Sequence, residues 1–248
     1  MVQVAPLQLS AAELQAPAAL FTALLAVVHL LSGRLRVDGE RRRRWLSAAS
    51  GVSVAYVFVL LLPEVSEAAL SVGERQGEAL LAEQLVYLMA LVGFVVFYGV
   101  EVVVVQRRGE PTETATGVYR FHLAVFALYS AVIGFLLFHQ EVETVTSLAL
   151  YAVAMGLHLV ATDAGLRRHH GAAFDRWGRW LLAGGTLVGG AMGALAAESG
   201  LALSMTFGFL AGAIVLNVVK EELPSLDQSR FVAFVSAALA YTVVLLLT

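Results

Sequence analysis

Cysteine is absent from this 248-residue chain, and its absence excludes both a disulfide framework and thiolate metal ligation. A metal site in this protein must therefore use histidine and oxygen ligands. Charged residues are also scarce, at 14% of the chain, against about 25% in soluble domains. Hydrophobic residues make up 59%, and the mean hydropathy is +0.79. This composition predicts an all-α integral membrane protein with a single membrane domain over residues 1–248.

Lysine is rare in the chain, and basic residues are missing from its first segment; these two features bear on its origin and location. Only one of the sixteen basic residues is a lysine, a bias typical of GC-rich coding sequences, which favours a prokaryotic protein of the inner or plasma membrane. The first residues contain no basic cluster and include Glu13, so they do not resemble a cleaved signal peptide. We therefore expect the first apolar run to be kept as a helix.

Long apolar runs dominate the rest of the sequence. A hydrocarbon core about 30 Å thick requires about 20 apolar residues per helix. By that measure the chain has eight candidate membrane helices, at about residues 16–32, 46–70, 80–105, 118–139, 145–166, 177–197, 203–223 and 231–247. The second of them is expected to continue past Pro63.

The basic residues predict how these helices are oriented. Fifteen of the sixteen lie in the connections after the first, third, fifth and seventh helices, and only Arg75 falls on the other side. Because short cytoplasmic loops are enriched in Lys and Arg, these connections are predicted to be cytoplasmic and both termini to lie outside. The opposite face is acidic, which would raise the local cation concentration, although acids also collect there simply because arginines are held inside.

Glycines recur at four-residue spacing in the last third of the chain. Gly185, Gly189 and Gly193 lie in the sixth expected helix, and Gly208 and Gly212 lie in the seventh. This pattern of small residues lets helix backbones approach closely in membranes. We interpret these glycines as packing positions rather than as a ligand site.

Three segments resemble the ZIP family of divalent metal transporters. They are GVSVAYVFVLLLPEVSEA at 51–68, GLHLVATD at 156–163 and FGFLAGAIVLNVVKEELPSL at 207–226, which are similar to the family's second, fifth and seventh helices. The resemblance implies eight transmembrane helices, both termini outside, a metal site between the fourth and fifth helices, and transport of a divalent cation such as zinc.

The chain departs from the family at the positions that bind metal. His158 and Asp163 match the first and last positions of the fifth-helix motif His-Glu-x-Pro-His-Glu, but the intervening Glu, Pro and second His are replaced. The fourth helix has no counterpart of the family's His-Asn-x-Pro-Glu-Gly in any register, and no proline lies in either helix. The resemblance therefore implies a divergent member whose metal site has changed.

His158 and Asp163 are the candidate transport-site residues. An ionisable side chain at membrane depth is costly and indicates a functional site by default. However, five residues at 100° per residue place the two side chains about 140° apart around the helix. A hydrogen-bonded core role for His158 stays open, as does an i, i+4 ion pair between Asp163 and Arg167.

Further candidates lie near the two faces. Outer entry-site candidates are Glu64 and Glu67 at i, i+3, together with His139 and Glu143 at i, i+4. Cytoplasmic exit candidates are Glu101, His122 and Glu221, which could release a cation or relay protons. His169 and His170 could bind a metal, but a basic loop facing anionic lipid is the ordinary interpretation.

These features leave two functional hypotheses open. One is a ZIP-like transporter for a small cation, with zinc or another divalent metal as its substrate. The other is a transport-inactive protein of the same fold that acts as a sensor, regulator or structural subunit. No activated nucleophile or phosphate-binding loop is evident, so we expect no enzymatic activity. The expected partners are the lipid bilayer, the cation and a second copy in a homodimer, with no nucleic acid.

Overall fold

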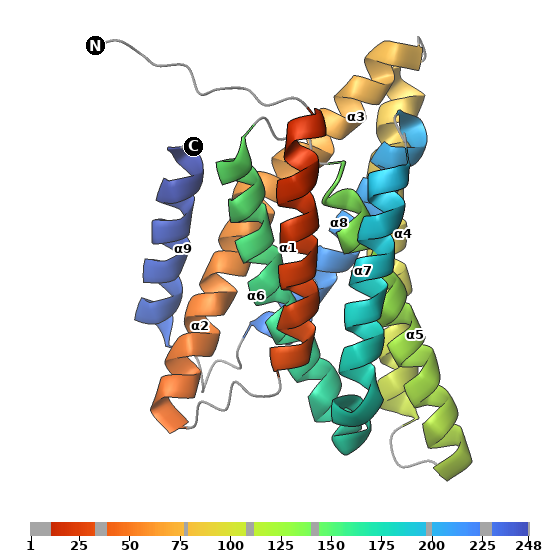
Figure 1. Cartoon of the computed structure of the whole chain (residues 1–248), viewed down its shortest axis with the longest axis vertical. Coiled ribbons are helices and arrows are strands. Elements are labelled where there is room, and N and C mark those ends of the chain that lie inside the picture. The colour runs from red at the N-terminus through yellow and green to blue at the C-terminus, as the bar shows by residue number, and fades with distance from the viewer. Residues whose placement is uncertain are drawn as a thin grey trace.

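The computed structural model describes residues 11–32, 39–76, 79–107, 112–139, 144–196, 200–223 and 230–247. These residues are helical, with short turns, and no strand occurs among them. Figure 1 shows the helices running roughly along the long axis of the molecule. They are α1 (Ala11–Leu31), α2 (Gly39–Tyr56), η2 (Val57–Leu61), α3 (Leu62–Gln76), α4 (Ala79–Gln106), α5 (Thr112–Leu136), α6 (Val145–His170), η3 (Phe174–Gly178), α7 (Arg179–Leu195), α8 (Leu201–Asn217), η4 (Val218–Glu222) and α9 (Phe231–Leu246).

Each of the eight expected segments is helical, which confirms an all-helical, polytopic architecture. Six helical spans are long and apolar enough to cross a membrane, and α9 is a shorter apolar helix of 16 residues. The count of eight crossings stays a prediction, since α7 has only 17 residues. The six spans are Ala12–Leu31, Arg43–Val72, Glu83–Gln106, Thr116–Leu136, Val145–His170 and Leu201–Lys220.

The second span continues past Pro63, as expected, through a local change of helix type. Residues Val57–Leu61 form a π-helical turn, and the backbone N–H of Leu62 donates to the carbonyl of Val57. Proline has no N–H and its ring clashes with the carbonyl four residues earlier, so an ordinary α-helical turn is disfavoured before Pro63. The wider turn lets α2, η2 and α3 form one continuous rod.

The helices group into two bundles by their closest packing. In the first bundle, α7 packs against α5 and α1, and α1 packs against α6; Figure 1 shows α1 between α6 and α7. In the second bundle, α8 packs on α4, α3 packs on α4, and α9 packs on α2. Contacts between the bundles are sparser and run mainly through α2 against α6 and η4 against α6.

Glycines form the closest helix contacts in both bundles, as predicted from their spacing. A Cβ atom at Gly189 would lie 1.8 Å from the carbonyl oxygen of Ala131 on α5. A Cβ atom at Gly212 would lie equally close, at 1.8 Å, to the carbonyl oxygen of Ala90 on α4. Real Cβ atoms cannot approach so closely, so only glycine permits this backbone contact, and the packing interpretation is confirmed.

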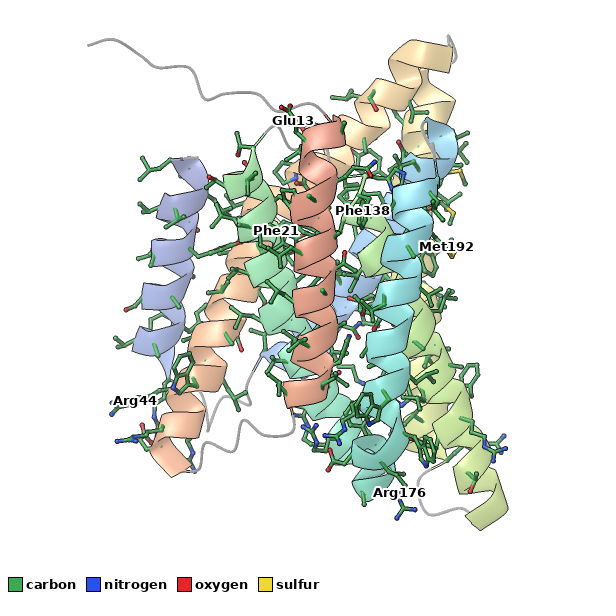
Figure 2. The ribbon with its side chains drawn as sticks, viewed as in Figure 1. Glu13, Phe21, Arg44, Phe138, Arg176 and Met192 are labelled. Atoms are coloured by element: carbon green, nitrogen blue, oxygen red, sulfur yellow. The ribbon has the colours of Figure 1, made fainter. Side chains whose placement is uncertain are left out.

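Charged side chains separate toward the two ends of the molecule. In Figure 2, Glu13 lies at one end, whereas Arg44 and Arg176 lie at the other. The start of α1 and the end of α9 share the end marked by Glu13. This arrangement agrees with the expected clustering of arginines on one face. Which face is cytoplasmic stays a prediction from the loop charges.

Candidate functional site

The boundary between α5 and α6 is where the ZIP resemblance places a metal site. Within the described residues these two helices make almost no close backbone contact. Side chains bridge them instead: the hydroxyl of Tyr129 on α5 lies 2.5 Å from Nε2 of His158 on α6. Both side chains are buried. His158 therefore has a polar partner from α5, which agrees with the open interpretation of a hydrogen-bonded core histidine.

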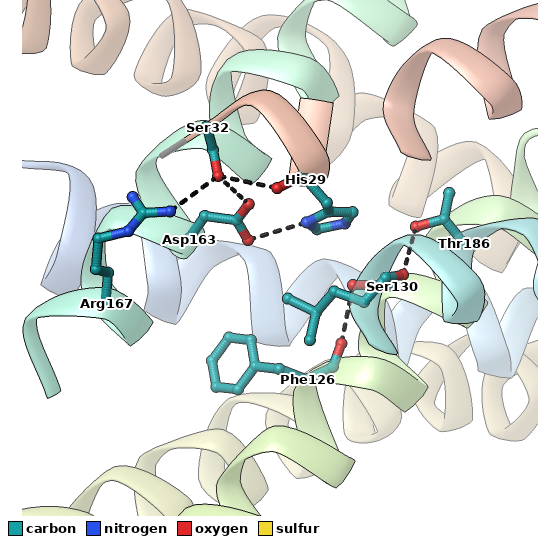
Figure 3. Close-up of polar contacts among 8 residues, drawn as sticks. His29, Ser32, Phe126, Ser130, Asp163, Arg167 and Thr186 are labelled. Atoms are coloured by element: carbon teal, nitrogen blue, oxygen red, sulfur yellow. Dashed lines mark hydrogen bonds and ion pairs between the residues drawn. The ribbon is translucent and has the colours of Figure 1, made fainter. Parts of the chain in front are cut away.

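Asp163 belongs to a different cluster from His158. Its Oδ1 lies 2.9 Å from Nδ1 of His29 on α1, and its Oδ2 accepts a 2.7 Å hydrogen bond from the Ser32 hydroxyl. Figure 3 shows the carboxylate held between these two residues. Both Asp163 and His29 are fully buried. The structure therefore separates the two candidate transport-site residues, in keeping with their 140° angular offset.

Arg167 does not pair with Asp163, although the i, i+4 spacing made that ion pair a plausible expectation. Its Nε donates to Oδ1 of Asp175 at 2.7 Å, and its Nη2 donates to the Ser32 hydroxyl at 3.4 Å. The guanidinium thus faces the exposed Asp175 and reaches the buried carboxylate only through Ser32 (Figure 3). Asp163 is satisfied by α1 rather than by its own helix.

The second ring nitrogen of His29, on the side away from Asp163, makes no described hydrogen bond. This nitrogen, Nε2, is buried. Ser130 and Thr186, drawn beside it in Figure 3, donate their hydroxyls to carbonyls one turn earlier in their own helices. No motif or spacing in the sequence assigns a role to His29, and only the general rule that a buried carboxylate needs a partner suggests one.

A second polar cluster joins the two bundles near the arginine-bearing end. Oε1 of Glu101 on α4 lies 3.2 Å from Nε2 of His122 on α5, while Nδ1 of His122 lies 2.8 Å from Nε2 of His170 on α6. Lys220 on η4 donates to the other oxygen of Glu101. Two of the three exit-site candidates, Glu101 and His122, are therefore in contact. The side chain of the third, Glu221, lies outside the described residues.

This cluster, which we call the Glu101–His122 cluster, has a linear geometry. His122 uses one ring nitrogen toward Glu101 and the other toward His170, so the three groups do not point at a common centre. A cavity of about 10 Å³ beside them is lined by Glu101, His122, Thr162 and His169, among others. That volume corresponds to about one water molecule. Among the described residues, no group of three His, Cys, Asp or Glu side chains is arranged to hold a metal ion.

The outer entry-site candidates are not brought together by any described contact. His139 bonds through Nδ1 to the Phe135 carbonyl of its own helix at 3.1 Å, and its ring stacks on Phe135. Glu67 is exposed, and Glu64 is half-buried with one carboxylate oxygen enclosed. Glu143 lies outside the described residues.

No family model matches this chain, and no curated protein is significantly similar to it.

Proposed function

We propose that this chain is a ZIP-like membrane protein that moves a small divalent cation of the zinc type, through a site that departs from the family pattern. The observation that carries the proposal is the contact between Glu101 and His122, which come from different bundles and meet in a buried position. Burying an ionisable pair in a membrane span is costly, and ionisable residues in such spans commonly mark ion pathways or proton relays.

The chemistry of the cluster fits a weak, releasable cation site. A carboxylate and two imidazoles are the ligand types that zinc accepts in proteins without thiolates. In the described arrangement the ammonium group of Lys220 is hydrogen-bonded to the carboxylate of Glu101. It takes the position beside that carboxylate that a substrate cation would need. An incoming metal must displace Lys220 and turn His122 away from His170. A site with such a built-in competitor binds loosely, which suits release.

Zinc uptake into proteoliposomes tests this proposal. The intact protein should accumulate zinc, and Glu101→Gln should reduce the uptake by at least tenfold because the cluster loses the carboxylate that His122 and Lys220 contact. Asp175→Asn is the matched control, since Asp175 is an exposed carboxylate at the same end. Lys220→Met should tighten zinc binding because the competing ammonium is removed. Unchanged uptake in Glu101→Gln would remove the cluster from the mechanism.

A transport-inactive role is the second candidate, and a separate observation favours it. Within the described part of the chain the buried carboxylates are Glu101 and Asp163, and they already have internal partners in Lys220 and His29. Carboxylates that are paired within the chain can hold helices in register without carrying an ion. This candidate predicts no zinc uptake by the intact protein and no zinc-dependent change in its thermal unfolding.

A further inference from the structure

Tryptophan is confined to one end of the molecule. The chain has three tryptophans, Trp45, Trp177 and Trp180, and their side chains are 66%, 68% and 57% exposed. All three lie beside arginines, at the end of the molecule marked by Arg44 and Arg176 in Figure 2. Exposed tryptophan is typical of the boundary between hydrocarbon and water, where its ring is apolar and its N–H is polar.

The turn from η3 into α7 combines two of these tryptophans with two arginines. Arg176, Trp177, Arg179 and Trp180 are spaced so that the arginines are three residues apart and so are the tryptophans. The guanidinium carbon of Arg179 lies 5.7 Å from the centroid of the Trp180 ring. Residues three or four apart on a helix are neighbours, so the arginines and tryptophans of this turn form one mixed patch.

The arginines of this turn are not neutralised by the described part of the chain. The neighbouring carboxylate, Asp175, pairs with Arg167, and neither Arg176 nor Arg179 has an acidic partner among the described residues. The Nε of Arg179 is buried and has no hydrogen-bond acceptor. A guanidinium that has no carboxylate beside it forms its strongest hydrogen bonds with other anionic oxygens, and the exposed Arg176 is open to such a partner.

We propose that this turn, which we call the Arg–Trp turn, binds the phosphate headgroup of an anionic phospholipid. Guanidinium groups match the oxygens of a phosphate diester, and those of Arg176 and Arg179 have no carboxylate partner in the described part of the chain. Trp177 and Trp180 hold the turn at the depth where such headgroups lie. The partner is a lipid rather than a soluble phosphate because the exposed tryptophans require an apolar phase beside the anion. The proposal does not depend on cation transport.

Intrinsic fluorescence gives a direct test because the tryptophans lie at the proposed site. In a Trp45→Phe background, the emission comes only from Trp177 and Trp180. Detergent-solubilised protein is titrated with dioleoyl phosphatidylglycerol, and dioleoyl phosphatidylcholine serves as the zwitterionic control. We expect a saturable blue shift with phosphatidylglycerol alone. Replacing both arginines, as Arg176→Gln with Arg179→Gln, should weaken binding by about fivefold per arginine.

Two controls make the outcome decisive. Arg230→Gln removes an arginine at the same end that is already paired with Glu40, so it should change the affinity by less than about twofold. The double variant Arg176→Lys with Arg179→Lys keeps the charge but loses the bidentate geometry and should give an intermediate affinity. An equal response to both lipids, an equal loss in Arg230→Gln, or equal competition by inorganic phosphate would each overturn the proposal.

Discussion

The helix α5 has two faces that are built on opposite principles. Against α7 it presents Ala127, Ala131 and Phe135, whose carbonyls accept the direct approach of Gly185, Gly189 and Gly193. Against α6 it presents Tyr129 and His122, whose side chains reach across to histidines. The first face brings two backbones into contact, and the second keeps two helices apart.

The difference shows how a membrane bundle makes room for polar groups. Between helices in lipid there is little hydrophobic driving force, so association depends on close van der Waals packing and on interhelical hydrogen bonds. Where glycines allow backbone contact, no space remains for an ionisable side chain. Where bulky aromatic and histidine side chains separate the backbones, polar atoms can meet. The α5–α6 boundary therefore holds chemistry that the α5–α7 interface excludes.

Gly189→Leu should break the packed face with the largest effect. The first side-chain atom alone would overlap the Ala131 carbonyl oxygen, so α5 and α7 must separate along their length. We expect a loss of at least about 3 kcal/mol of stability, at the upper end of overpacking effects. Thermal unfolding of the purified protein in detergent measures it.

Gly184→Leu is the matched control for this substitution. Gly184 lies on the same helix, and a Cβ there would meet nothing within 4 Å. Its replacement should leave the midpoint of unfolding within a few degrees of the parent. Because leucine favours a helix over glycine, an equal loss of stability in both variants could not come from helix propensity, and it would show that the contact with the Ala131 carbonyl does not set the effect.

Asp163→Asn tests a polar contact between helices, the one that Asp163 on α6 makes with His29 on α1 and with Ser32. The substitution keeps the side-chain volume but replaces the charged acceptor of His29 and Ser32, so we expect a loss of about 2 kcal/mol, typical of hydrogen bonds to a charged group. Asp175→Asn is the control, because its ion pair with Arg167 is half-exposed and should be worth about 1 kcal/mol or less. Chemical denaturation in mixed micelles compares them. Equal losses would mean that burial adds nothing to the Asp163 contact.

Much of the fold could be predicted because membrane helices are specified by local composition. The apolar runs located all eight helical segments, and the glycine spacing identified the packed interfaces, since both signals repeat within single helices. The π-helical turn before Pro63 could not be predicted in the same way. Proline forbids the regular hydrogen bond, but whether a helix bends, breaks or widens depends on the neighbours that pack against it.

The candidate site was less predictable because its contacts join distant parts of the chain. Sequence spacing correctly separated His158 from Asp163 around their helix, but it could not show that Asp163 meets His29, 134 residues away. The pairing of Glu101 with His122 likewise depends on how the two bundles meet, which no single helix encodes. The i, i+4 rule favoured Arg167 for Asp163, and a tertiary partner displaced it.

Tyr129→Phe sharpens the α5–α6 half of the comparison. Removing the hydroxyl leaves Nε2 of His158 without that bond in a buried position, so we expect a loss of about 1–2 kcal/mol. Tyr98→Phe is the control, since Tyr98 is exposed on α4. Measurement of unfolding midpoints for both variants distinguishes a structural bond from a surface effect. A loss in Tyr98→Phe as large as in Tyr129→Phe would contradict the proposed bridge.

The pairing of α2 with α9 combines a close glycine contact with a polar contact between side chains. A substitution in its polar contact should have the smallest effect on stability of those predicted. Gly51 packs against the Phe234 carbonyl within the bundle, and outside the apolar span Glu40 accepts two 2.6 Å hydrogen bonds from Arg230. These hydrogen bonds lower the pKa of Glu40 from 4.5 to about 2. A carboxyl group with a depressed folded-state pKa stabilises the fold above its unfolded pKa, and this contribution is lost as the pH falls from about 4.5 toward 2.

Glu40→Gln should therefore lower the unfolding temperature slightly at pH 6, and the difference from the parent should vanish as the pH approaches 2. The effect should be small because the pair is exposed to solvent. Arg41→Gln is the control, since Arg41 is exposed at the same end and has no described partner. It should show no such dependence on pH. A difference between Glu40→Gln and the parent that stayed as large at pH 2.5 as at pH 6 would mean that Glu40 acts through packing rather than through its charge.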